Sequence, residues 1–283
     1  MEVIYEDNHI IAVDKTCREI VQGDKTGDKP LSEMLKVWLK EKYCKPGNVF
    51  VGVTHRLDRP VSGVVIFAKT SKALSRLNEM FRVGEVRKTY WAIVKNRPPQ
   101  DEGELVDWLV RNEKQNKSYA YDTERPNAKK AILRYKLIAH SDNYYLLEID
   151  LKTGRHHQIR AQLANAGCPI WGDQRYNPAA KAGQQVALWA YSLTIEHPTL
   201  KQEMTFTLPP HGAAWKPFET ELKALCGGVR IVYADENILC CNKAAGMSVA
   251  AADGGDSLQA RLEAALGGRV YPVHRLDVAT GGL

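Results

Sequence analysis

The stretch Thr54–Lys69, THRLDRPVSGVVIFAK, places a polar segment between two apolar runs and predicts a strand, a loop and a second strand. Pro60 cannot donate a backbone hydrogen bond to a sheet, and Gly63 tolerates backbone angles that other residues avoid. Both residues favour an exposed loop between the strands. The decisive feature of the chain is therefore a polar loop held between two strands.

Four residues of this loop, His55 to Asp58, form the tetrapeptide HRLD. In an extended backbone alternate side chains point to the same side, so Arg56 and Asp58 are expected to share one face. A carboxylate held beside guanidinium groups stays ionised and faces whatever enters the loop. The same tetrapeptide returns at residues 274–277, near the end of the chain. The loop is therefore a candidate functional site and a marker of internal duplication.

The composition is that of a folded protein with a mildly basic charge. With 283 residues and 44% hydrophobic content, the chain can bury one large core or two smaller ones. Its 39 Lys and Arg against 33 Asp and Glu give a formal net charge of +6. The excess belongs to residues 1–228, which hold 34 basic and 27 acidic residues. This charge is compatible with a polyanionic partner without requiring one.

The cysteines and the apolar runs indicate the compartment. The six cysteines form no CxxC pair and show no ligand-like spacing with histidine, which favours reduced thiols in the cytosol. Charged residues begin at Glu2, so no signal peptide is predicted. No apolar run approaches the ~18 residues that a membrane span needs. We expect a soluble, cytoplasmic and monomeric protein that does not enter membranes.

The apolar patterns predict more strands than helices. Helices are expected from Leu31, after Ser71 as N-cap, before Gly167, and over Trp215, Phe218, Leu222 and Leu225. Strands are expected at 3–5, 10–13, 50–53, 64–68, 87–94, 105–110, 131–139, 144–151, 186–195 and 204–208. Strands and helices do not alternate regularly, so the predicted class is α+β, with a mixed, mostly antiparallel β-sheet and flanking helices.

The chain begins again after Gly227-Gly228, its only obvious linker. Residues 231–239 repeat the pattern of residues 3–11, and Lys243 matches Lys15. The order of these anchors is preserved up to the second HRLD tetrapeptide. We therefore predict a catalytic domain at residues 1–226 and, at residues 229–283, the truncated N-terminal part of a second, similar domain. A 55-residue piece is marginal as an independent domain.

Three polar clusters follow one another along the chain and stand as HRLDRPVSG at residues 55–63, RKTY at 87–90 and LKTGRHHQIR at 151–160. In this order they closely resemble the RluA-type RNA pseudouridine synthases. That family carries a catalytic H-R-L-D-x-x-[ST]-S-G loop, a [RK]-K-x-Y strand and an L-x-T-G-R-x-H-Q-I-R helix start. Residues 168–173 and 196–198 also look like family landmarks. The resemblance covers about residues 1–210 and recurs from residue 229.

The resemblance implies the pseudouridine synthase fold and the isomerisation of specific uridines in structured RNA, rRNA or tRNA, to pseudouridine. In that reaction the N1–C1′ bond breaks and the base is rejoined through C5, with no metal and no cofactor. By resemblance, Asp58 is the catalytic aspartate, and Arg160 pairs with it. Tyr90 is expected to stack against the base and to act as general base on a sugar proton.

Further residues are expected to bind the substrate. A uridine inside folded RNA must flip out to reach the loop, and by resemblance Arg56 fills the gap that it leaves. His157 and Gln158 lie at the start of the predicted third helix and are expected to contact the RNA. Leu188 is expected to form an apolar wall for the base. No residue is assigned to a metal.

Two other functions are compatible with parts of the sequence. A non-catalytic RNA-binding module could keep the same fold, although the presence of all three catalytic residues argues against it. A hydrolase could pair Ser62 with His55, but no G-x-S-x-G elbow and no placed acid supports that alternative. The second HRLD has an aspartate, Asp277, but no tyrosine strand or Gln-Ile-Arg helix follows it. The predicted chemistry therefore belongs to Asp58 alone.

Overall fold

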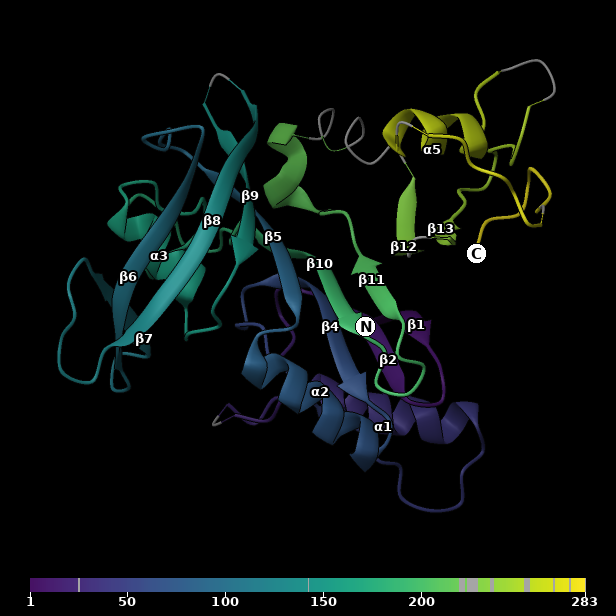
Figure 1. The fold of residues 1–283 in the computed structure, drawn as a ribbon, viewed down its shortest axis with the longest axis horizontal. Coiled ribbons are helices and arrows are strands. Elements are labelled where there is room, and N and C mark those ends of the chain that lie inside the picture. Colours follow the sequence, from purple (N-terminus) through teal and green to yellow (C-terminus); the bar gives the residue numbers. More distant parts are fainter. Residues whose placement is uncertain are drawn as a thin grey trace.

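The computed structural model describes residues 1–24, 26–141, 143–218, 222, 229–234, 237–251, 255–266, 268–274 and 276–282 (Figure 1). Within these residues thirteen strands form one sheet. The strands are β1 (Glu2–Glu6), β2 (Ile10–Lys15), β3 (Gly52–Val53), β4 (Ser62–Ala68), β5 (Arg87–Val94), β6 (Glu102–Asn112), β7 (Lys117–Tyr121), β8 (Lys129–His140), β9 (Tyr145–Leu151), β10 (Leu188–Glu196), β11 (Glu203–Thr207), β12 (Arg230–Ala234) and β13 (Leu239–Asn242). The helices are α1 (Leu31–Lys42), α2 (Ser71–Val83), α3 (Gln158–Asn165), the short 3₁₀ helix η1 (Ala213–Phe218) and α5 (Leu258–Leu266).

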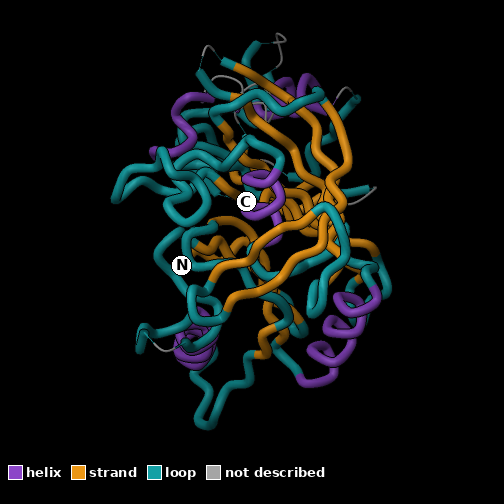
Figure 2. The backbone as a smooth tube through the Cα atoms, turned by 90° about the vertical axis from the view of Figure 1, so that its left-hand side faces the viewer, coloured by secondary structure: helices purple, strands orange, loops and turns teal. Residues whose placement is uncertain are grey.

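The main path of the sheet runs β1-β2-β4-β10-β5-β9-β8-β6-β7. Among the described strands, β4 and β10 form the one parallel pair, and the other pairs are antiparallel. Seen from the side, the strands form a continuous band through the molecule (Figure 2). Helix α2 packs on β3 and β4, whereas α3 packs on β6 and β7. The predicted α+β class with a mixed, mostly antiparallel sheet is confirmed.

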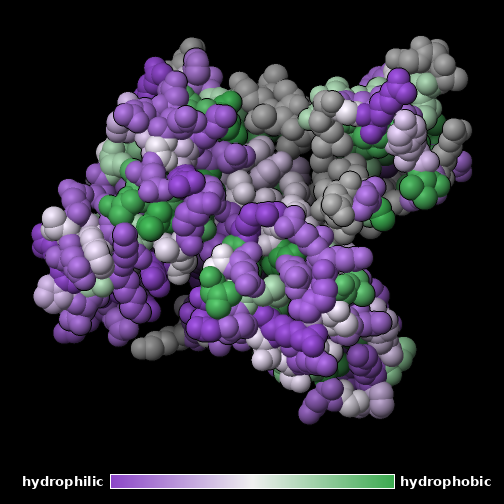
Figure 3. All heavy atoms as spheres, viewed as in Figure 1, coloured by the Kyte–Doolittle hydropathy of each residue, from purple (hydrophilic) through white to green (hydrophobic). Residues whose placement is uncertain are grey.

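The core lies around the strands that carry the opening loop. Every residue of β2 and of β4 is buried, and β5 is buried from Tyr90 to Val94. Such runs without polar alternation are typical of strands that are covered on both faces. The outer face is different, because hydrophilic residues cover most of the surface seen in Figure 3, with only small apolar patches between them.

The loop ends at a close approach between β4 and β10. Gly63 has φ +120°, and a Cβ placed there would lie 2.3 Å from the carbonyl oxygen of Ala190. Only glycine fits such a position without moving the backbone. Because Gly63 and Ala190 are partners in the parallel pair, this contact fixes the end of the loop against β10.

The N-cap of α2 corrects one detail of the prediction. It is Thr70, not Ser71, because the Thr70 side chain accepts a hydrogen bond from the Ala73 amide. Of the last predicted helix, Trp215 and Phe218 lie in the 3₁₀ helix η1, which contains Pro217. Leu222 is helical and buried, and Leu225 lies outside the described residues.

The C-terminal segment joins the sheet through β12, where Ala234 pairs with Thr205 of β11. Its hydrogen bonds repeat those of the N-terminal segment. Lys15 Nζ donates to the carbonyl of Arg59 at 2.9 Å, and Lys243 Nζ donates to the carbonyl of Val278 at 3.3 Å. Gly282 pairs with Lys243 as Gly63 pairs with Lys15. The predicted linker Gly227-Gly228 and Arg275 of the second tetrapeptide lie outside the described residues.

Candidate active site

A buried lysine donates hydrogen bonds to the backbone of the loop from His55 to Gly63. Lys15, at the end of β2, is fully buried and donates to the carbonyls of Asp58 at 3.2 Å, Arg59 at 2.9 Å and Val61 at 2.6 Å. Burial lowers the pKa of Lys15 to about 8, while Glu19 and Asp58 oppose this change. The ammonium is therefore mainly charged at pH 7 and donates to three carbonyls of the turn, of which that of Asp58 also accepts from the Val61 amide at 3.0 Å.

The alternation expected along the loop matches the burial. Leu57 is buried and Arg56 is exposed. The ring of His55 stacks on Phe81 at 4.8 Å, and its Nε2 accepts a hydrogen bond from the Ile66 amide at 3.1 Å. Burial lowers the pKa of His55 to about 3, with a smaller effect from Lys88. Since its Nε2 lone pair is occupied by the backbone of β4, His55 supports the loop and cannot serve Ser62 as a base.

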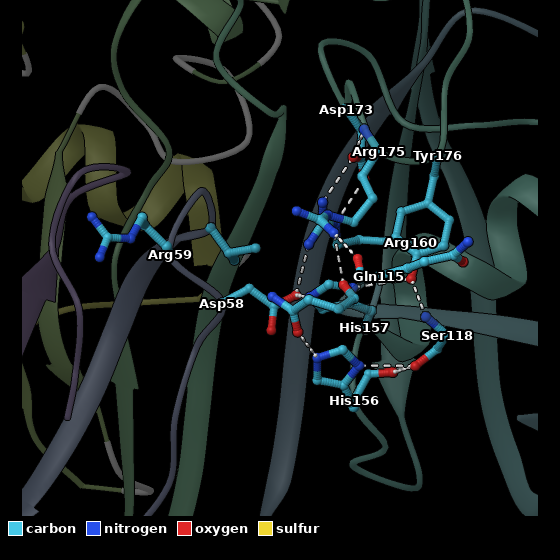
Figure 4. A network of polar contacts seen from close by, with 12 residues as sticks. Asp58, Arg59, Gln115, Ser118, His156, His157, Arg160, Asp173, Arg175 and Tyr176 are labelled. Atoms are coloured by element: carbon cyan, nitrogen blue, oxygen red, sulfur yellow. Dashed lines mark hydrogen bonds and ion pairs between the residues drawn. The ribbon is translucent and has the colours of Figure 1, made fainter. Parts of the chain in front are cut away.

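Arg160 joins two carboxylates that come from distant parts of the chain (Figure 4). It lies on α3 with 4% of its surface exposed. Its Nε and Nη2 donate to the buried Asp173 at 2.7 and 2.8 Å, and its Nη1 donates to Asp58 Oδ2 at 3.1 Å. Burial alone disfavours this charge, but the contacts with Asp173 and Asp58 raise the pKa of Arg160. A planar guanidinium held along one edge is thus directed at Asp58.

His157 approaches the same oxygen of Asp58. Its Nε2 lies 3.6 Å from Asp58 Oδ2, and its Nδ1 lies 3.0 Å from the hydroxyl of Tyr176. Figure 4 shows these residues gathered on one side of Asp58, with Arg59 on the other side. Burial, and then the neighbouring Arg160, lower the pKa of His157 to about 2. The imidazole is therefore neutral at physiological pH.

Tyr90 and Leu188 come from neighbouring strands. Tyr90 of β5 is 9% exposed and pairs with Ala190 of β10. Burial raises its pKa, and the charge of Asp58 adds to this effect, which places the phenol within electrostatic reach of Asp58. Leu188, at the start of β10, is buried and pairs with Ala92 of β5. The charge of Asp58 therefore acts on the predicted tyrosine, and the contact of Leu188 with the base stays a prediction.

Gln158 is buried and engaged within the protein. Its Oε1 accepts hydrogen bonds from Thr153 Oγ1 at 2.7 Å and from the Arg155 amide at 3.0 Å. Its Nε2 donates to the carbonyl of Ile132 and to Gln162. These bonds shape the turn that leads into α3. Its predicted contact with RNA stays a prediction.

Three residues of the site received no role from the sequence: Lys15, Asp173 and Tyr176. Asp173 ends the segment 168–173 that resembles the family, and Tyr176 follows it in GDQRY. Lys15 ends a strand that begins with four apolar residues, IIAVDK, which could have suggested a buried cation. Both signals are weak, because each motif is short.

The described part of the chain contains no group of three or more His, Cys, Asp or Glu residues arranged to hold a metal ion. No helix of the described ranges is long and apolar enough to span a membrane. The groups that act on Asp58 are the cations Lys15 and Arg160, the neutral imidazole of His157 and the phenol of Tyr90. The Asp58 carboxylate itself is partly exposed.

Comparisons with known proteins show the family of the chain. Residues 9–165, more than half of the chain, match the family described as RNA pseudouridylate synthase. The chain is 32% identical over 217 residues to the dual-specificity RNA pseudouridine synthase RluA of Haemophilus influenzae, covering 73% of this chain and 91% of that protein. It is 33% identical over 175 residues to the ribosomal large subunit pseudouridine synthase C of Rickettsia bellii, covering 62% of this chain and 56% of that protein. The chain thus spans only about half the length of the latter relative.

Solved structures show the same fold. The human RNA pseudouridylate synthase domain containing 4 superposes with a TM-score of 0.62 at 22% identity, covering 73% of this chain and 87% of that chain. The chain belongs to the RNA pseudouridylate synthase family, a family of isomerases that modify RNA.

Proposed function

We propose that this chain converts uridines in structured RNA to pseudouridine, with Asp58 as the catalytic aspartate. The main support is the contact of the buried Arg160 with Asp58 Oδ2 at 3.1 Å, while Asp173 holds the other edge of the guanidinium. A fixed cation beside a carboxylate favours its charged, nucleophilic form. The Asp58 side chain is 27% exposed, so an incoming nucleotide has access to it.

In the proposed reaction the N1–C1′ bond of the uridine breaks, the freed uracil turns, and a C5–C1′ bond forms before C5 loses its proton. Asp58 attacks the nucleotide or otherwise labilises it, and Arg160 holds the carboxylate in place. Tyr90 is a neutral phenol because its pKa is raised by burial and by Asp58. A phenol of that kind is a weak base, so we assign Tyr90 to stacking against the uracil ring. Leu188 supplies an apolar wall beside it.

The uridine must leave its stack to reach Asp58, at a cost of a few kcal/mol. Arg56 is exposed on the same loop, and no hydrogen bond or ion pair joins its side chain to another residue in the described ranges. A guanidinium can stack on the bases that remain and offset part of that cost. We therefore propose that Arg56 occupies the space of the flipped nucleotide.

Tritium release from RNA carrying 5-³H uridine tests the proposal, because pseudouridine formation removes the hydrogen at C5. The wild type should release tritium, and Asp58→Ala should reduce release to background with RNA binding unchanged. Asp101→Ala is the matched control, since Asp101 makes a surface ion pair with Arg97. RNA binding by both proteins without release by either would show a non-catalytic RNA-binding module instead.

The RNA substrate is proposed from the relatives, whose names refer to the ribosomal large subunit and, for the Vibrio cholerae relative with 29% identity, to tRNA. We propose rRNA or tRNA as the substrate class. Pseudouridine mapping in cells that lack the gene would identify the position, because one site should lose its signal and regain it on complementation. We further propose that the protein acts in the cytoplasm as a monomer, which localisation and sedimentation experiments would test.

We also propose that residues 229–283 form a second unit that resembles the N-terminal part of the first and that they take no part in catalysis. The support is the repeated pattern of bonds around Lys15 and Lys243. Limited proteolysis should cut near Gly227-Gly228 and leave the isomerase activity of residues 1–226. Loss of activity together with this segment would contradict the proposed division.

A further inference from the structure

Asp58 receives two donors on one oxygen. Arg160 Nη1 and His157 Nε2 lie 3.1 and 3.6 Å from Asp58 Oδ2. Neither contact involves Oδ1. A carboxylate held through one oxygen keeps its plane fixed, and the other oxygen remains available to the nucleotide.

The proton of His157 is placed by a chain of hydrogen bonds that begins in the backbone of β7. The Ser118 amide donates to the hydroxyl of Tyr176 at 2.7 Å. The hydroxyl oxygen of Tyr176 lies 3.0 Å from His157 Nδ1, and a hydroxyl that already accepts from Ser118 has its proton available to donate there. An Nδ1 that accepts must carry a lone pair, so the ring proton of the neutral imidazole lies on Nε2, the nitrogen that faces Asp58.

The charges around the ring keep it neutral. Arg160, His156 and Arg175 surround His157 and act with burial to lower its pKa, while Asp173 acts weakly in the opposite direction. Burial raises the pKa of Tyr176 to about 12, so its hydroxyl keeps its proton. His156 also stacks on the His157 ring at 3.8 Å. Neither group changes its charge near neutral pH.

The backbone of His157 is unusual as well. Its φ is 54°, a left-handed conformation that is unfavourable for a residue with a side chain. This residue is the N-cap of α3 but makes no side-chain cap bond to the helix. Its imidazole instead turns toward Asp58 and Tyr176.

We propose that Tyr176 is a positioning residue that fixes the tautomer of His157, so that a neutral N–H is presented to Asp58 Oδ2 and Oδ1 is left to react. At 3.6 Å the N–H acts through its dipole rather than through a full hydrogen bond. A protonated imidazole would compete with Arg160, and the other tautomer would turn a lone pair toward the carboxylate. This inference rests on the proposed role of Asp58.

The tautomer can be measured without any activity assay. In wild-type protein with ¹⁵N-labelled histidine, long-range ¹H–¹⁵N spectra should show His157 as a single Nε2–H tautomer throughout pH 6–8. Tyr176→Phe should give a mixture of tautomers. Tyr119→Phe is the matched control, because it removes a hydroxyl from β7, the strand of Ser118, that donates to Gln115 Oε1 at 2.6 Å and has no contact with His157 among the described residues. Its His157 spectrum should match the wild type.

Kinetics then separate positioning from a structural role. Tyr176→Phe should lower kcat about tenfold with KM within twofold, because His157 no longer presents a fixed N–H to the Asp58 carboxylate, whereas the RNA surface is unchanged. His157→Gln, whose amide can still offer an N–H, should keep more activity than His157→Leu.

An Nδ1–H or protonated His157 in the wild type, or unchanged kcat in Tyr176→Phe with a mixed tautomer, would overturn the inference. Absence of tritium release by the wild type would refute the proposed function, and the tautomer spectra would then decide the inference alone.

Discussion

Arg160 Nη1 lies 3.1 Å from Asp58 Oδ2, although the two residues are 102 positions apart in the chain. The same guanidinium makes a two-bond contact with the fully buried Asp173. A surface ion pair contributes little, but here one partner is buried and the fork geometry leaves the cation a single direction. The site is therefore arranged before any substrate arrives.

Arg160→Lys should separate charge from geometry. A lysine keeps the positive charge but cannot reach both Asp173 oxygens and Asp58 together, so kcat should fall about 100-fold and stability by about 2 kcal/mol. Tritium release and denaturant unfolding measure the two effects. Arg134→Lys is the control, because Arg134 pairs with Glu104 on the surface. Activity of Arg160→Lys within threefold of wild type would show that charge alone suffices.

Gly63→Ala should disrupt the end of the loop. The new Cβ would lie 2.3 Å from the Ala190 carbonyl oxygen at a φ of +120°, so β4 and β10 must separate. We expect a loss of stability of about 2 kcal/mol or more and of most activity, measured by thermal unfolding and tritium release. Gly47→Ala, which has nothing within 4 Å of its Cβ, should behave like the wild type. A fully active, stable Gly63→Ala would contradict the described contact.

Lys15→Met and Lys243→Met form a matched pair within one chain. Both lysines are buried and donate to loop carbonyls, but only Lys15 supports the loop that carries Asp58. Lys15→Met should lower kcat more than tenfold and destabilise the protein by about 2 kcal/mol, because buried carbonyls lose their donor. Lys243→Met should leave activity within twofold of wild type. Equal losses of activity would indicate that the C-terminal segment takes part in catalysis.

Acid should destabilise the protein through His55. Its pKa is about 3 in the folded protein and about 6.5 as the ordinary value, so between these limits the unfolded chain binds more protons than the folded one. The free energy of unfolding should therefore fall as pH decreases below 6.5, by about 2 kcal/mol at pH 5 for this histidine alone. His157, with a pKa of about 2, adds to the same trend.

Urea unfolding at pH 7, 6 and 5 measures this dependence. His55→Gln should show a smaller decrease than the wild type, since the variant has one fewer group to protonate on unfolding. His140→Gln, at an exposed histidine, should keep the wild-type slope. The same slope in His55→Gln and in the wild type would show that His55 is not held neutral.

The local patterns of the chain predicted most of its elements, but not strand β7 (Lys117–Tyr121). The apolar runs of β2, β4 and β5 and the hairpin of β8 and β9 occur where periodicity placed them, and the α+β class follows from their number and order. The prediction failed where local signals compete, because Thr70 rather than Ser71 caps α2. Adjacent hydroxyl residues offer nearly equal caps, and only the geometry of the turn selects one.

The sequence by itself determined the polar loop of Asp58, the strand of Tyr90, the turn before Arg160 and the repeat of Lys15 in Lys243, because each is a short pattern of neighbouring residues. Only the tertiary structure decided that Arg160 is shared between Asp58 and Asp173, and that Tyr176 reaches His157. These contacts depend on how α3 and the segment after it lie against the sheet. Periodicity specifies which face of a strand is buried, but not which distant side chain will meet it there.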